Sequence, residues 1–359
     1  MRTLWFDPDD TDFGKKALNR REFLIGAVSV AGGLTFAACD SSTSTGSSSA
    51  SSGKKYTLAF VPGLLTDAPF YITAKDAAVA EAKALGQTLK VDAPAQFSAT
   101  LQVPIIDTYI AQKVDAIITA PVDSQTLLGP LQRANSAGIK VITFDTYLGN
   151  GDYEKGPVTF PVSYIGSDNT QGGQLAGEAL IKSIGGRGKI YLQSTAPGVS
   201  SEDQRIAGFK QAIDEANHRS GKEIVTLAGI NYDGGSTAKA TSQVQALLER
   251  DPNAAGFFGT NFFSCDGIVA ALNNTKKASI VKVAYFDATP NGITNLRNGI
   301  VTLVVAQKPA DMGKLAVDYA IKALNGEAGV QKHMGTGFVV ITRDTVDNPQ
   351  SQAAIYKTN

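Results

Sequence analysis

From Tyr56 to the C-terminus, short apolar and β-branched runs alternate with longer segments that have the spacing of amphipathic helices. Several short runs are apolar at every position, as expected for strands of a parallel sheet covered by helices on both faces. Eleven strands are more than one doubly wound sheet needs, so the sequence predicts an α/β fold with two open parallel sheets. The predicted strands are residues 56–61, 88–92, 115–120, 140–145, 162–166, 189–193, 223–230, 255–259, 281–286, 301–306 and 338–342.

The segments between these strands include four with apolar residues at three- and four-residue spacing, which predicts helices. Ser167, Asp168 and Asn169 precede the second helix and form a strong N-cap cluster. The glycine-rich residues 185–188 precede a strand instead of opening a helix, so they predict a helix C-cap and a turn, not a phosphate-binding loop. The four helices are predicted at residues 70–85, 171–184, 203–216 and 238–248.

Polar and aromatic side chains follow the carboxyl ends of the predicted strands, which is where open α/β sheets bind ligands. Carboxylates, amides and aromatic rings dominate this set, and histidine, cysteine and activated serine are absent from it. The pattern therefore favours binding of a small polar ligand over catalysis. The residues are Phe70, Tyr71, Asp145, Tyr232, Asn261, Asp287 and Gln307.

Short motifs along this body match those of one known protein family. Ala68-Pro69-Phe70-Tyr71 resembles the start of the family's first helix, and residues 115–121 and 137–145 resemble two strands of its first lobe. Residues 167–173 match the opening of its second lobe, and residues 205–209 resemble the helix that bears its sugar-contacting arginine. Each motif is short, but their order and spacing together resemble those of the periplasmic sugar-binding proteins of the ribose-binding type.

The resemblance implies the type I periplasmic binding protein fold, in which two doubly wound parallel-sheet lobes are joined by a hinge of three strands. Crossings between the lobes are expected near Pro161, Gln307 and Phe338. The N-terminal lobe would then comprise residues 56–161 and 308–337. The C-terminal lobe would comprise residues 162–307 and 338–359.

The resemblance also implies a site for a sugar, with Arg205 as its arginine and Asn261, Asp287 and Gln307 as polar contacts. Carboxylates at Asp145 and Asp287 can each accept two hydroxyl protons, and the Arg205 guanidinium offers a fork of donors. Asn261 and Gln307 can donate and accept together. These chemistries suit the hydroxyls of a sugar ring, while Phe70 and Tyr71 would pack against its C–H faces.

Several alternatives stay open at this point. Asp145 could cap the following helix, and Asp123 and Asp168 are interpreted as caps. Phe70 and Tyr71 could instead belong to the core of the first lobe. The aromatic wall from the second lobe is assigned to Tyr232, with Phe262 or Phe263 as the alternative. Thr146 stands where the ribose-binding pattern has an arginine, which favours another pentose, a hexose or a polyol over ribose.

The N-terminus predicts export. Residues 1–38 have the features of a signal peptide: paired Arg20 and Arg21, as in twin-arginine signals, precede a short uncharged apolar run. Cys39 follows a sequence that resembles a lipoprotein cleavage box, with Phe36 in place of the usual aliphatic residue. Residues 39–55, rich in Ser and Thr, predict a flexible, lipid-anchored linker. The alternative is that the arginines are ordinary surface charge and Cys39 a buried small residue.

Composition excludes several classes of protein. The 33 basic and 33 acidic residues balance, which argues against a general nucleic-acid binder. Two cysteines cannot form a disulfide framework, and the two histidines lack partners at metal-ligand spacing, so neither metal nor cofactor is predicted. An enzyme is disfavoured, and a transcriptional regulator would need a DNA-reading module where the export signal stands.

The sequence thus predicts a monomeric, extracytoplasmic solute-binding protein, located in the periplasm or on the outer face of the cell membrane and anchored through Cys39. It would capture a sugar or polyol by hinge closure and deliver it to an ABC transporter permease. The alternative is a sensor of sugars or signal molecules with the same fold and no transport role.

Overall fold

The structure, a computed structural model, describes residues 54–358. Arg20, Arg21, Cys39 and the predicted signal peptide lie outside the described residues, so the predictions made for them stay predictions. Within residues 54–358, no helix is both long enough and apolar enough to cross a membrane.

The first sheet has six strands in the order β11-β5-β4-β3-β1-β2, and every neighbouring pair is parallel. Strand β1, which lies between β3 and β2, buries both faces, as the continuous apolar pattern predicted. Leu58 and Phe60 pack into one hydrophobic cluster, and Ala59 and Val61 pack into another. The strands are β1 (Thr57–Val61), β2 (Thr88–Val91), β3 (Ala116–Thr119), β4 (Lys140–Phe144), β5 (Ser163–Gly166) and β11 (His333–Gly335).

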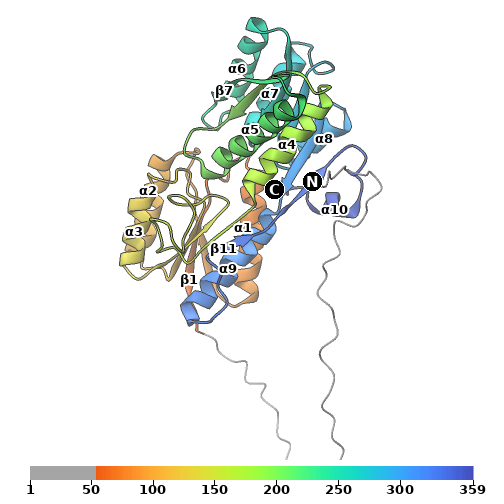
Figure 1. The fold of residues 1–359 in the computed structure, drawn as a ribbon. Coiled ribbons are helices and arrows are strands. Elements are labelled where there is room, and N and C mark those ends of the chain that lie inside the picture. The colour runs from red at the N-terminus through yellow and green to blue at the C-terminus, as the bar shows by residue number, and fades with distance from the viewer. Residues whose placement is uncertain (1–53, 359) are drawn as a thin grey trace, which may run out of the picture. The chain divides into compact units, whose positions relative to one another are not determined.

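Helices cover both faces of this sheet. The helices α2 (Ala99–Ala111) and α3 (Leu128–Ser136) lie on one side of it, and α1 (Pro69–Ala84) and α9 (Pro309–Asn325) lie on the other (Figure 1). Helix α9 packs beside α1, although about 230 residues separate the two helices along the chain.

The second sheet also has six strands, in the order β12-β10-β9-β8-β6-β7. All neighbouring pairs are parallel except β10 and β12, which are antiparallel. The strands are β6 (Gly188–Ser194), β7 (Val225–Tyr232), β8 (Ala254–Gly259), β9 (Lys282–Phe286), β10 (Val301–Gln307) and β12 (Phe338–Ile341). The remaining helices are α4 (Asn169–Ser183), α5 (Ser200–Ser220), α6 (Thr237–Arg250), α7 (Phe262–Asn274), α8 (Pro290–Arg297) and α10 (Pro349–Ala353).

The two sheets confirm the predicted fold class, and they correct one predicted boundary. Strand β5 pairs with β4 in the first sheet, so the chain leaves the first lobe at Ser167 and not at Pro161. An apolar run predicts a buried strand without showing which sheet it joins, which is why this boundary was misplaced. The second crossing follows Gln307, and the third lies at residues 336–337, between β11 and β12.

Helices α4 and α5 pack at very close range because glycine stands where they meet. A Cβ at Gly173 would overlap the carbonyl oxygen of Arg205, and one at Gly208 would overlap that of Thr170. As predicted, Asp168 caps α4 by accepting a hydrogen bond from the Gln171 amide. The close packing of α4 against α5 at these glycines fixes the position of α5 and hence of Arg205.

Candidate functional site

A small cavity lies at the carboxyl ends of the strands, where both lobes contribute side chains. Its volume is about 30 Å³. The lobes also bond directly to each other: the Tyr147 amide donates to Ser200 Oγ (2.9 Å), and the Ser124 amide donates to the Gly198 carbonyl (3.2 Å). A cavity of this volume holds about one water molecule, so the site must enlarge before it can hold a sugar. The lining residues are Phe70, Tyr71, Phe97, Asp145, Thr195, Val199, Ser201, Glu202, Arg205, Asn261, Phe262, Phe263, Asp287 and Gln307.

This lining contains seven of the eight side chains singled out in the sequence, and Tyr232 is the exception. Tyr232 ends β7, which is the edge strand of the second sheet, so it lies beside the cavity and not in its wall. The aromatic wall of the second lobe is formed by Phe262 and Phe263, whose ring centroids are 3.9 Å apart. The structure thus favours the alternative to Tyr232.

The Arg205 guanidinium is held by several contacts, and one of its nitrogens has no hydrogen-bond partner. Its Nε donates to Asn169 Oδ1 (2.8 Å), its Nη1 donates to the Thr260 carbonyl (2.7 Å), and its guanidinium stacks on Phe286 at 3.9 Å from the ring centroid. Nη2 is buried without a hydrogen-bond partner, 4.0 Å from Asp145 Oδ1. Because an unmade bond at a buried charged donor is costly, this nitrogen is suited to a ligand oxygen.

Asp145 follows β4 in a left-handed backbone conformation with φ 61°, which is uncommon for a residue other than glycine. Its Oδ2 accepts a hydrogen bond from the Tyr71 hydroxyl (2.9 Å), and its Oδ1 faces Arg205. Burial raises the pKa of Asp145 to about 7, although the Arg205 charge opposes the shift. A left-handed backbone and a carboxyl with a raised pKa are features often found together at functional sites.

The raised pKa predicts a pH dependence of stability. With the lobes in contact, as in this structure, we expect the free energy of unfolding to contain a contribution that falls as pH rises from about 4 to 7. The folded state keeps a proton on Asp145 in this range and the unfolded state has released it. Urea unfolding of the protein and of Asp145→Asn isolates this contribution: their difference in stability should decline to pH 7 and then level off. A difference that stays constant or grows contradicts the assignment.

Asp287 occupies the corresponding place after β9, again with a left-handed backbone (φ 80°). Its Oδ1 accepts hydrogen bonds from Gln307 Nε2 (2.9 Å) and from the Tyr356 hydroxyl (3.1 Å). Burial raises its pKa, and Arg205 and these donors oppose the shift. Two equivalent strand ends, one in each lobe, thus aim a carboxylate into the same cavity.

Glu202 is a buried member of the site that sequence reasoning missed. Its carboxylate accepts hydrogen bonds from Ser194, Thr195, Thr260 and Asn261, so it ties β6, α5 and α7 together. The available signal was its position on α5, one turn before Arg205. Asn261 is correspondingly committed to the protein: it caps α7 through the Ser264 amide and donates to Glu202. It lines the cavity chiefly as a support.

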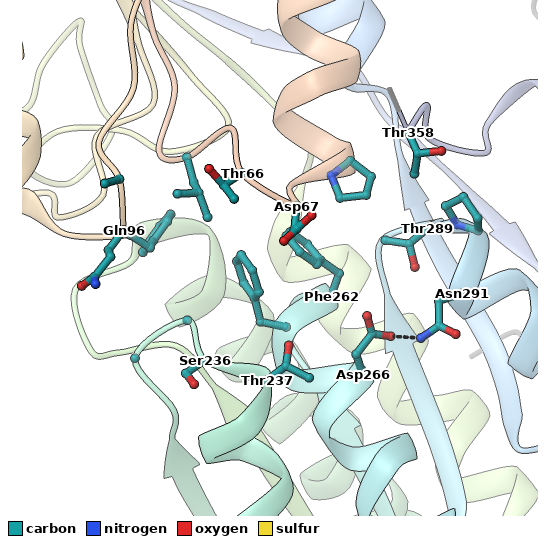
Figure 2. Close-up of a pocket in the computed structure, with 18 residues that line it drawn as sticks. Thr66, Asp67, Gln96, Ser236, Thr237, Phe262, Asp266, Thr289, Asn291 and Thr358 are labelled. Atoms are coloured by element: carbon teal, nitrogen blue, oxygen red, sulfur yellow. Dashed lines mark hydrogen bonds between the residues drawn. The ribbon is translucent and has the colours of Figure 1, made fainter.

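A wider groove of about 720 Å³ opens beside this cavity and shares Phe97, Phe262 and Phe263 with it (Figure 2). Its polar side chains are hydroxyls, amides and carboxylates. Asp266 is oriented there by Asn291, at 2.7 Å, and no Lys or Arg is among the described residues that line it. The groove and the cavity thus share an aromatic wall. Within residues 54–358, no group of three or more His, Cys, Asp or Glu side chains is arranged to hold a metal ion.

Comparison with known proteins shows which family this chain resembles. Residues 58–328 match the family model described as a periplasmic binding protein domain. The ribose import binding protein RbsB of Salmonella typhimurium is 31% identical over 279 residues, which cover 78% of this chain and 88% of that protein.

Two solved structures extend the comparison. An ABC transporter solute-binding protein from Agrobacterium vitis, bound with α-D-tagatopyranose, is 38% identical with a TM-score of 0.80, covering 84% of this chain and all of that one. A periplasmic solute-binding protein from Actinobacillus succinogenes with bound D-allose is 26% identical with a TM-score of 0.72, covering 82% of this chain and 99% of that one. Most of the described chain is thus matched by this family, and the chain belongs to the periplasmic binding protein domain family.

Proposed function

We propose that this protein captures a small sugar or polyol outside the cytoplasm by closing its two lobes around it, and delivers it to an ABC transporter permease. One observation carries the proposal: Asp145 from the first lobe and Arg205 and Asp287 from the second converge on one buried cavity. A ligand that bonds to both lobes stabilises the closed form by its differential affinity for it. The transport role is supported by the relatives, which are named as import or transporter binding proteins.

The chemistry of the cavity fits a polyhydroxylated ligand. Asp145 Oδ1 and Arg205 Nη2 offer an acceptor and a donor that the protein leaves without close partners. Phe70 from the first lobe and Phe262 from the second supply apolar surface for the C–H faces of a ring. A ligand lacking a hydroxyl at the carboxylate would leave a buried charge unpaired, which is how such a site selects among stereoisomers.

The relatives guide the choice of sugar. Thr146 replaces the arginine of the ribose-binding pattern, which argues for a hexose, another pentose or a polyol, and the Agrobacterium vitis protein is bound with tagatopyranose. We expect isothermal titration calorimetry with D-tagatose, D-allose, D-ribose, D-arabinose and myo-inositol to reveal a dissociation constant of about 1 µM or below for at least one of them. If none of the five compounds binds, the proposal that the protein captures a small sugar or polyol is contradicted.

Export and anchoring are a second part of the proposal, and they are supported by the sequence alone. Arg20 and Arg21 would direct the chain to the twin-arginine route, and Cys39 would carry the lipid. Anchoring predicts that the protein sediments with membranes and that Cys39→Ser moves it to the soluble fraction. Arg20→Lys with Arg21→Lys should leave it unprocessed inside the cell. An unchanged membrane fraction in Cys39→Ser would exclude the lipid anchor.

A further inference from the structure

The last residues of the described chain touch both lobes. We call residues 354–358 the C-terminal strap. Within it, the Tyr356 amide donates to the Ala288 carbonyl (2.9 Å), next to Asp287 in the second lobe. The following amide, of Lys357, donates to Thr73 Oγ1 (2.8 Å) on α1 of the first lobe. Two consecutive amides of the strap are therefore bonded to different lobes, outside the three predicted crossings.

The side chain of Tyr356 reaches behind the cavity without lining it. It is 3% exposed, and its ring packs edge-on against Phe70, with centroids 5.8 Å apart. Its hydroxyl donates to Asp287 Oδ1 (3.1 Å) and accepts from the backbone amide of Gln307 (2.9 Å). A phenol has one proton to donate, and here that proton goes to a carboxylate that faces the cavity.

Tyr356 thus contacts three residues that line the cavity: Phe70 of the first lobe, Asp287 of the second lobe, and Gln307 at the second crossing. Asp287 has a left-handed backbone, a conformation that persists only when its surroundings hold it. The Tyr356 amide bonds to the residue after Asp287, and the Tyr356 hydroxyl bonds to its carboxylate. The strap therefore holds Asp287 at both its backbone and its side chain.

We propose that Tyr356 is a positioning residue of the sugar site. Its hydroxyl orients the Asp287 carboxylate toward the ligand, and its ring packs against Phe70 in the opposite lobe. The inference rests on the proposed function, since a ligand must use Asp287. The tyrosine acts through Asp287 and does not touch the ligand.

The test compares Tyr356→Phe, which removes the hydroxyl alone, with Tyr153→Phe as a matched control. Tyr153 is 2% exposed, and its hydroxyl bonds to the Leu148 amide and to Thr143 Oγ1, each at 2.9 Å. It belongs to the first lobe and does not line the cavity. Both variants lose a buried hydroxyl with two partners, so a general structural effect appears in both.

Two readouts are measured on the full mature protein. Calorimetry with the tightest-binding of the five panel compounds should give about tenfold weaker binding for Tyr356→Phe, as expected for a lost bond to a charged group, and less than twofold weaker binding for Tyr153→Phe. Carbon-13 NMR of the side-chain carboxyl should show the pKa of Asp287 higher in Tyr356→Phe, because a donor to its charged form is gone, and unchanged in the control.

The outcomes separate the two proposals. If the unmodified protein binds none of the panel compounds, the proposed function fails, while the pKa of Asp287 still tests the role of Tyr356. If a panel compound binds and Tyr356→Phe matches the unmodified protein in affinity and in the pKa of Asp287, the positioning role is overturned. Equal losses of affinity in both variants, with the pKa of Asp287 unmoved, would also overturn it.

Discussion

Replacing Asp145 by alanine is expected to weaken binding of the cognate sugar by roughly 2–5 kcal/mol, because truncating one partner of a buried charged pair leaves the other unpaired. The carboxylate is 6% exposed and lies 4.0 Å from the unpartnered Arg205 Nη2. A sugar hydroxyl placed between these groups would accept from one and donate to the other. Loss of the Asp145 carboxylate leaves both the sugar hydroxyl and the Arg205 guanidinium without a buried partner.

Calorimetry measures this effect, and Asp168→Ala is the control. Asp168 is exposed and caps α4, so its loss should lower stability by about 1 kcal/mol and leave sugar affinity unchanged. The pair thereby distinguishes a site carboxylate from a structural one. If Asp145→Ala binds the sugar as tightly as the unmodified protein, Asp145 is a cap and not a ligand contact, which is the alternative that the sequence left open.

Replacing Arg205 by alanine is expected to lower the free energy of unfolding by roughly 3–5 kcal/mol even without ligand, because it leaves buried acidic groups uncompensated. Asp145, Glu202 and Asp287 all line the cavity, and among the described lining residues Arg205 alone is basic. The stacking on Phe286 and the bonds to Asn169 and Thr260 are lost as well.

Urea unfolding measures this loss against Arg297→Ala. Arg297 pairs with Asp347 at 2.7 Å, but both side chains are exposed, so its removal should cost less than about 1 kcal/mol. Arg205 lowers the pKa of Asp145 and of Asp287, so its removal raises both values, and protonation at pH 5 should return part of the lost stability. A loss as small as that of Arg297→Ala, or one that is identical at pH 5 and pH 7.5, contradicts this account of the buried charges.

Much of the fold could be predicted because a parallel sheet covered on both faces leaves a clear apolar pattern. All eleven predicted strands are present, and β11 was missed because its three residues, His333, Met334 and Gly335, lie at an edge and are not fully buried. Strand β5 was found but assigned to the wrong lobe, because sheet membership depends on pairing with β4, which local sequence does not encode.

The site was predictable where a residue stands at the end of a central strand. Asp145 and Asp287 follow β4 and β9 directly, so their convergence could be read from the strand ends, whereas their left-handed backbone could not. Tyr232 also ends a strand, but β7 is the edge strand of its sheet, and Tyr232 is not among the residues that line the cavity. Tyr356 gave no signal, since its contact with Asp287 spans 69 residues and comes from the C-terminal tail.

The central claim is that this protein works as a clamp whose two lobes close on a sugar. Small-angle X-ray scattering of the protein tests it most directly. It is recorded with and without a saturating amount of a panel compound that calorimetry has shown to bind. The account predicts a smaller radius of gyration and a changed scattering curve in the presence of that compound, because closure brings Asp145 toward Arg205 and Asp287. Superimposable curves under both conditions would contradict it.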